Sequence, residues 1–407
     1  MSKCKIGRYL IDEIENLVLG HHKMLFLSGP RQCGKTTLAK LLLKDEMSYF
    51  SWDDLKFKNL WIKQIDVLAE RTLSKVEPRV VLDEIHKNAK WKNQVKAFYD
   101  KYGDKIQIIL TGSAHLNVFR KGADSLLGRF IHFHLHPLSY GELSSSKPFR
   151  FKEFVYAIGH LYEFQNYRQN SNLLNNLLKF GGFPEPFLLQ DENFHQIWIK
   201  NRFELLIRQD VAELSNFLQS NQVAILAALL PDRVGSVLST QSLKEDLDVA
   251  HTTVSRWLEA LKSVYFHFDV SPYSKNIVRS LKKDKKIFLY DWSPIESEGP
   301  RFENMVACHL KKMVDFYNDT GQSNLNLNYL RNKDKNEVDF VILEKGKPLV
   351  SIEVKINDLN LDLTFLKFRK KQSFPHIQIV RVPKVFRVYK EYDAAVISFE
   401  NFFARLP

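Results

Sequence analysis

The stretch GPRQCGKTTLAK, residues 29–40, decides the fold of the first part of the chain. It follows the apolar run MLFLSG and has the spacing G-x-x-x-x-G-K-T, with Gly29, Gly34, Lys35 and Thr36 at the fixed positions. Glycines let backbone N–H groups turn inward around phosphate oxygens, and the start of the following helix adds its positive end. The stretch therefore predicts a nucleotide-binding loop between a strand and a helix.

Two acids after the apolar run VVL extend this site. We expect Lys35 to reach the β- and γ-phosphates of ATP, and Thr36 and Asp83 to hold Mg²⁺. Glu84, just past the predicted strand, is placed to polarise the attacking water as the catalytic base. The residues predicted to contact the nucleotide are Gly29, Pro30, Arg31, Gln32, Cys33, Gly34, Lys35, Thr36, Thr37 and Asp83.

Further candidate residues of the ATP site follow later in the chain, near other apolar runs. The run IQIILTGS ends in Thr111 and Ser113, and either side chain could sense the γ-phosphate. Arg129 is a candidate arginine finger that would stabilise transition-state charge, in its own subunit or in a neighbour's. Arg120 is its rival, and a plain surface ion pair is the alternative role for Arg129.

Composition narrows the class of protein. The 407 residues suggest several domains, and 59 Lys and Arg against 47 Asp and Glu give a net charge of +12. A basic balance favours nucleic acid, DNA above all, as a partner. The three cysteines are far apart, which argues against a disulfide framework or a cysteine metal site. Neither a signal peptide nor a membrane span is evident, so we expect a cytoplasmic protein.

The whole pattern resembles a known family. Alternating strands and helices in residues 1–143 predict a parallel α/β sheet, and with the phosphate loop this part is similar to an AAA-type P-loop ATPase core. The motifs LTGSAHL, LLGRFIHFHLHPLSYGEL and FGGFPEPF resemble bacterial and archaeal ATP-binding proteins with an uncharacterised C-terminal domain. The resemblance covers residues 24–356 and implies an ATPase core, a winged-helix segment and a nuclease-like C-terminal fold.

The middle of the chain is predicted to form a helical connector, residues 144–219, and a winged helix-turn-helix, residues 220–285. Within STQSLKEDLDVAHTTVSRWLEALKS we expect two helices around the turn DVAH, the second starting at an N-cap Thr, with VYFHFDV as a wing strand. The alternative is that this segment only packs against the ATPase core. If this segment binds DNA, the side chains that face the major groove would be those of Thr252, Thr253, Ser255 and Arg256. A following basic segment offers phosphate contacts or a solvated face: Lys275, Arg279, Lys282, Lys283, Lys285 and Lys286.

Residues 286–407 predict a second α/β domain with a β-hairpin at NEVDFVILEKGKPLVSIEVKIN. Glu353 and Lys355 share one strand face. A two-residue turn would put Asp339 on the other face, whereas a three-residue turn or a bulge would pair it with Glu353.

Asp, then Glu-x-Lys, resembles the PD-(D/E)xK, or restriction-endonuclease-like, core, with Val338 where the motif has proline. The resemblance implies that Asp339 and Glu353, with Glu303 from the preceding helix, hold Mg²⁺ or Mn²⁺, and that Lys355 assists the attacking water. A structural hairpin with a Glu353–Lys355 pair is the alternative.

Taken together, the sequence predicts a multidomain ATPase coupled to a nuclease-like, DNA-acting domain. An alternative is a nucleotide-controlled switch or scaffold whose nuclease-like fold binds nucleic acid or protein without cutting. A third is an ATP-driven remodeller of protein partners. The sequence leaves open whether the protein forms a homo-oligomer or binds a protein partner.

Overall fold

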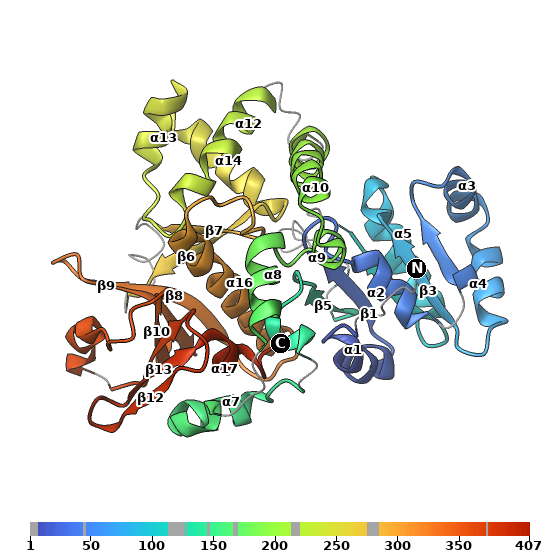
Figure 1. Ribbon diagram of the computed structural model, residues 1–407. Helices are drawn as coiled ribbons and strands as arrows, with labels where there is room; N and C mark the ends of the chain where they lie inside the picture. Colours follow the sequence, from blue (N-terminus) through green and yellow to red (C-terminus); the bar gives the residue numbers. More distant parts are fainter. Residues whose placement is uncertain are drawn as a thin grey trace. The chain divides into compact units, whose positions relative to one another are not determined.

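The structure is a computed structural model of the chain (Figure 1). It describes residues 7–43, 46–112, 126, 128–144, 147–165, 170–212, 220–274, 285–371 and 373–407. The chain divides into two compact units, which we call unit 1, Met1–Pro137 with Ser263–Tyr265, and unit 2, Leu138–Lys262 with Phe266–Pro407. Several predicted site residues lie outside the described residues, namely Ser113, Arg120, Lys275, Arg279, Lys282 and Lys283.

Unit 1 is built on a parallel sheet in the order β2-β3-β4-β1-β5. Its strands are β1 (Met24–Ser28), β2 (Tyr49–Ser51), β3 (Arg79–Asp83), β4 (Gln107–Thr111) and β5 (Phe130–His134). Every residue of β1 and β3 is buried, which explains why their sequences are continuous apolar runs without alternation. The parallel α/β sheet predicted for this part of the chain is confirmed.

Helices connect these strands. They are α1 (Ile11–Leu17), η1 (Leu19–His21), α2 (Lys35–Leu42), η2 (Glu46–Ser48), α3 (Leu55–Lys63), α4 (Ile65–Leu73), η3 (Ile85–Lys87) and α5 (Trp91–Tyr102). Helix α3 starts where it does because the Asp54 carboxylate accepts a hydrogen bond from the Lys56 backbone N–H. Helix α5 turns Trp91, Val95 and Phe98 into the core at helical spacing.

Unit 2 contains most of the remaining helices. They are α6 (Tyr140–Leu143), α7 (Phe151–Gly159), η5 (Leu161–Phe164), α8 (Ser171–Phe180), α9 (Pro184–Leu189), α10 (Glu192–Leu205), the π-helix η6 (Leu206–Val211), α12 (Ser220–Leu229), η7 (Pro231–Arg233), α13 (Thr240–Leu247), α14 (His251–Ser263), α16 (Glu298–Asp319), η8 (Leu363–Lys371), η9 (Lys390–Tyr392) and α17 (Phe399–Phe403). No helix among the described residues has the length and hydropathy needed to cross a membrane.

Unit 2 also holds a mixed sheet in the order β12-β13-β11-β10-β9-β8-β6-β7. Its strands are β6 (His267–Pro272), β7 (Lys286–Leu289), β8 (Leu325–Arg331), β9 (Glu337–Glu344), β10 (Lys347–Lys355), β11 (His376–Val380), β12 (Phe386–Tyr389) and β13 (Ala394–Ser398). The long helix α16 contacts β7, β8 and β10 (Figure 1). The predicted wing strand is β6, and it pairs both with β7 and with β8. The predicted domain boundary at residue 285 therefore falls between two paired strands.

The motif PLSYGEL supports the core of unit 2. A Cβ atom on Gly141 would lie 2.0 Å from the Leu406 carbonyl oxygen, so only glycine fits there. The Lys312 ammonium on α16 lies 2.6 Å from the Glu142 carboxylate, and the two side chains are 2% and 1% exposed. The Tyr140 backbone N–H donates to Nε2 of His309, also on α16, over 3.0 Å. The motif thus fixes α6 against α16.

Candidate nucleotide site and acidic cluster

The phosphate loop has the backbone geometry that its glycines predict. Gly29 and Gly34 have φ angles of 151° and 99°, and Gln32 between them has a φ of 66°. The Lys35 ammonium points back into the loop and donates to the carbonyls of Gly29, at 2.9 Å, and Pro30, at 2.8 Å. Helix α2 begins at Lys35, directly after Gly34, so its N-terminal N–H groups face the same loop.

The end of strand β5 closes the back of this loop. A Cβ atom on Gly29 would lie 2.2 Å from the Leu135 carbonyl oxygen, which also accepts from the Cys33 thiol at 3.3 Å. The buried Arg8 guanidinium donates to the carbonyls of Cys33, at 2.7 Å, and His136, at 2.6 Å. Sequence reasoning missed Arg8, because nothing in its local sequence indicates a partner this distant.

Asp83 ends strand β3 among three hydroxyl groups. Thr36 donates to Oδ2 of Asp83 over 3.2 Å, and the Tyr49 and Thr111 hydroxyls donate to the same carboxylate. Burial and the Asp83 carboxylate raise the pKa of Tyr49, so its hydroxyl keeps its proton. A carboxylate beside a threonine hydroxyl is the hard oxygen set that Mg²⁺ prefers, so Thr36 and Asp83 fit the predicted ion. Thr111 contacts Asp83 here, and its predicted contact with the γ-phosphate stays a prediction.

Glu84 follows in a left-handed conformation, with a φ of 55°. Its backbone N–H donates to the Thr111 carbonyl over 3.1 Å, and His86 Nε2 lies 3.5 Å from its carboxylate. Burial raises the pKa of Glu84 to about 7, against the opposing effect of the Lys35 ammonium. A carboxyl group whose pKa lies near neutrality suits the predicted role of a base toward water.

Arg129 makes an ion pair at the surface of unit 1. Its Nε donates to Oδ1 of Asp100 over 2.7 Å, and both side chains are partly exposed. This contact matches the surface ion pair that the sequence left as an alternative, and the arginine-finger role stays a prediction.

The hairpin β9–β10 brings the predicted acids together by means of a bulge. Lys345 and Gly346 have φ angles of 49° and 79° and form a two-residue turn, since Lys347 pairs with Glu344. The register then shifts between Pro348 and Val350, so Ile352 lies opposite Phe340. This shift brings Asp339 beside Glu353, and the Asp339 backbone N–H donates to Oε2 of Glu353 over 3.4 Å. The alternative that required a bulge is confirmed.

Hydrogen bonds hold these side chains in place. The Val354 backbone N–H donates to the Asp339 carboxylate over 2.9 Å, and the Lys355 ammonium donates to the Glu353 carboxylate over 2.7 Å. Lys355 also lies 3.3 Å from Asp362, which sequence reasoning missed. The predicted Asp339, Glu353 and Lys355 therefore converge at one place on the sheet.

A lysine lies among these acids. The Nζ atom of Lys286 is 2.7 Å from Glu337, 3.5 Å from Glu303 and 3.8 Å from Asp339, measured to carboxylate oxygens. Neither alternative left open for Lys286, a phosphate contact or a solvated face, holds, because its side chain is only 2% exposed and faces this cluster. Its neighbour Lys285 lies 3.0 Å from Asp269. We call Glu303, Glu337, Asp339, Glu353 and Lys286 the acidic cluster.

Burial and neighbouring charges together shift the pKa values in the acidic cluster. Burial raises the pKa of Glu303 and of Glu353 to about 8, and the nearby Asp339 carboxylate adds to both increases. Burial lowers the pKa of Lys286, but Glu303, Asp339 and Glu337 outweigh it and raise that pKa overall. Lys286 is therefore a permanent cation in this cluster.

The predicted divalent cation does not fit the cluster in this arrangement. Within the part of the chain that the structure describes, no three His, Cys, Asp or Glu side chains are grouped to hold a metal ion. The carboxylates of Glu303 and Asp339 face the Lys286 ammonium, whose positive charge opposes the binding of a second cation at short range.

Helix α14 presents the predicted DNA-facing residues. It begins at His251, one residue before the expected N-cap, and buries Val254, Trp257, Leu258 and Leu261. Thr252 and Arg256 are exposed, and Thr253 and Ser255 are half-buried. The polar face predicted for this helix is therefore turned away from the core of unit 2.

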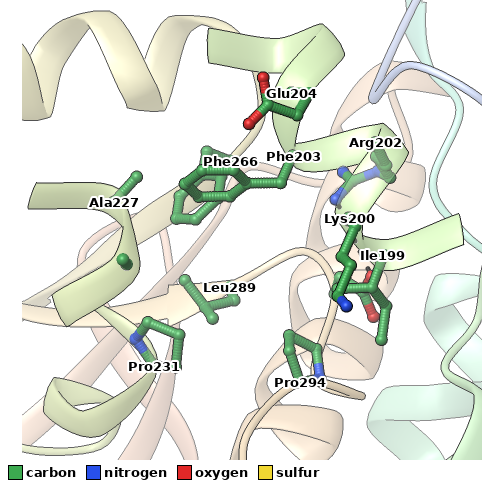
Figure 2. A pocket seen from close by; sticks show the side chains of 12 residues that line it. Ile199, Lys200, Arg202, Phe203, Glu204, Ala227, Pro231, Phe266, Leu289 and Pro294 are labelled. Carbon is green, nitrogen blue, oxygen red and sulfur yellow. Dashed lines mark ion pairs between the residues drawn. The ribbon is translucent and has the colours of Figure 1, made fainter. Parts of the chain in front are cut away.

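Unit 2 also contains a mainly apolar pocket that the sequence did not predict (Figure 2). Its volume is about 430 Å³, and its lining residues come from α10, α12, the β7 region and the segment before β6. The rings of Phe203 and Phe266 lie on one side, with centroids 6.3 Å apart. Arg202 lies 3.9 Å from Asp291, both in the lining and nearly buried. The pocket has the size and polarity of a small-molecule site.

Comparisons with known proteins agree with the nucleotide site. Residues 21–144 match the family model of an AAA domain. Residues 171–296 and 298–401 match two domains of unknown function, DUF8612 and DUF4143. The loop geometry and the first match identify unit 1 as a P-loop ATPase domain of AAA type, whereas the C-terminal match names no activity.

Relatives extend over most of the chain. An uncharacterized protein of Methanocaldococcus jannaschii is 26% identical over 368 residues, which cover 86% of this chain and 78% of that protein. An uncharacterized protein of Haemophilus influenzae is 22% identical over 387 residues, covering 87% and 88%.

Solved structures are more distant. A Walker-type ATPase of Pyrococcus abyssi shares 14% identity with a TM-score of 0.39, covering 75% of this chain and 97% of its own. The Aeropyrum pernix ORC1 protein, solved in complex with DNA, shares 13% identity with a TM-score of 0.31, covering 73% and 92%.

Proposed function

We propose that this protein is an ATP-hydrolysing switch that controls nucleic-acid binding by unit 2, and that its C-terminal part has a nuclease-like fold that binds without cutting. The observation that carries the proposal is the position of Lys286. Its ammonium lies within 4 Å of the three carboxylates of Glu303, Glu337 and Asp339, where a nuclease would need a divalent cation.

The ATP site supplies the controlling reaction. Lys35 would bind the β- and γ-phosphates, while Thr36 and Asp83 would hold Mg²⁺, which neutralises phosphate charge when bound. Glu84 would accept a proton from the attacking water, and its pKa of about 7 supports this role. Tyr49 and Thr111 would keep the Asp83 carboxylate in one orientation through their hydrogen bonds to it.

The nucleic-acid half of the proposal depends on α14 and on net charge. Arg256 is exposed on the polar face of α14, where it could contact phosphate or a base edge. The net charge of +12 favours a polyanionic partner. An ATPase that only remodelled proteins would need neither feature.

Fluorescence anisotropy with a short labelled DNA duplex tests the proposal. Binding should weaken steeply as salt rises, and ATP and ADP should give different affinities. Arg256→Ala should reduce the slope of log K against log salt by about 1 if Arg256 contacts a phosphate. Arg71→Ala is the matched control, since Arg71 is an exposed helical arginine of unit 1. Binding that is absent at every salt concentration would move the conclusion to the remodeller of protein partners.

A second candidate function is a metal-dependent nuclease coupled to the ATPase. The register that pairs Asp339 with Glu353, with Lys355 on the same strand, favours it. Plasmid DNA incubated with Mg²⁺ or Mn²⁺, with and without ATP, separates the two candidates. We expect binding without nicks, whereas nicking that Asp339→Ala abolishes would establish the nuclease.

A further inference from the structure

We infer that Lys286 is a built-in cation that takes the place of a divalent metal in the acidic cluster, so that the cluster acquires a metal site only when this lysine is removed. The inference rests on the proposed function and deepens it. It explains how a nuclease-like fold would bind nucleic acid without cutting it.

The backbone fixes Lys286 at the centre of the cluster. Lys286 is the first residue of β7, paired with Val270 on β6 and bridged to Val237 on its other side. Its ammonium lies 5.6 Å from the centre of the Tyr329 ring, a distance at which a cation is attracted to the ring face. The backbone of Lys286 is therefore fixed by strand pairing, and its ammonium has an aromatic neighbour.

The cluster is also closed over the lysine. Gly235 has a φ of 74°, and a Cβ atom there would lie 2.6 Å from Oε2 of Glu303. The loop backbone therefore covers the Glu303 carboxylate, and any larger residue at position 235 would push against it. The side chain of Lys286 is 2% exposed, so its ammonium is shielded from solvent, whereas the Glu303 and Asp339 side chains beside it are 19% and 18% exposed.

The carboxylates are already distributed between two ammonium groups. Lys286 contacts Glu303, Glu337 and Asp339, while Lys355 contacts Glu353 and Asp362. A divalent ion bound by Glu303 and Asp339 would lie a few ångströms from the Lys286 ammonium, and two cations that close repel each other. Removing the ammonium would leave the half-buried carboxylates of Glu303, Glu337 and Asp339 without their cation, and hard oxygen ligands of this kind bind Mn²⁺ or Mg²⁺.

Mn²⁺ counting by electron paramagnetic resonance tests the inference on the full chain without nucleotide or DNA. The Lys286→Met protein should bind one more Mn²⁺ per chain than the wild type, and adding Asp339→Asn should remove that extra ion. Lys285→Met is the matched control, because the neighbouring lysine contacts Asp269 outside the cluster, and it should bind as many ions as the wild type. A folded Lys286→Met protein that gains no ion would overturn the inference.

A second comparison does not depend on the stability of the Lys286 variant. Wild-type and Asp339→Asn proteins should bind the same number of Mn²⁺ ions, since the wild-type cluster holds none. An ion lost in Asp339→Asn would overturn the inference. Because no nucleic acid is present, these counts can fail while the salt-dependent DNA binding succeeds, and the reverse also holds.

Discussion

Acidification should destabilise unit 2 through one buried histidine on α16. His309 is 2% exposed, and its ring lies 5.1 Å from that of Phe399 and 5.0 Å from that of Phe403, between centroids. Its Nδ1 donates to the Met305 carbonyl over 2.7 Å, while Nε2 accepts from the Tyr140 backbone N–H over 3.0 Å. Both nitrogens are therefore used by the neutral ring, and a proton on Nε2 would break the contact with Tyr140.

The size of the expected loss of stability follows from the difference in the pKa of His309 between the folded and the unfolded chain. Burial, with the nearby Lys312 ammonium, lowers the pKa of His309 to about 3, whereas an unfolded chain has about 6.5. The unfolded state then binds more protons between these values, so stability is complete above pH 6.5 and falls as the pH drops toward 3. Between pH 7 and pH 5 the loss at this one side chain is about 2 kcal/mol.

Urea unfolding at pH 7 and pH 5, followed by tryptophan fluorescence, measures this loss. His309→Gln cannot titrate, so its free energy of unfolding should fall by about 2 kcal/mol less than that of the wild type over the same interval. The buried His376 acts in the same direction, with a pKa of about 3, but is present in both proteins and cancels. His160→Gln is the control, because His160 is exposed. Equal losses in wild type and His309→Gln would refute the reasoning.

Three further predictions concern the ATP site. Lys35→Ala should abolish tight binding of a fluorescent ATP analogue, whereas Glu84→Gln should keep binding and lose turnover; hydrolysis at the wild-type rate in Glu84→Gln would mean that another group is the base. Gly29→Ala combines a disfavoured φ with a backbone clash and should lower ATP affinity at least tenfold, about 1.4 kcal/mol, while Gly128→Ala, with a φ of 78° and open space, should leave affinity unchanged. If Arg129 acts in trans, mixing co-assembling Arg129→Ala and Lys35→Ala proteins should restore some ATPase activity, and no recovery would favour the surface ion pair.

The phosphate loop and its sheet could be predicted from the sequence because their signals are local. Gly29, Gly34, Lys35 and Thr36 lie within one turn and helix start, and their spacing alone fixes the chemistry. Strands buried on both faces leave continuous apolar runs, which can be seen without knowing their partners. The same reasoning found Asp83 and Glu84, since both come directly after such a run.

The acidic cluster could not be predicted in full from the sequence alone, because the tertiary structure brings its residues together. The sequence left two registers open for the hairpin, and the bulge between Pro348 and Val350 chose the one that pairs Asp339 with Glu353. Lys286 looked like one member of a basic segment, because a run of lysines has the same appearance whether it faces solvent or acids. Its burial results from the pairing of β7 with β6 and from the position of Glu303 on α16, contacts between residues distant in the chain. Long-range pairing of this kind has no local signal, so it was decided only when the sheet of unit 2 formed.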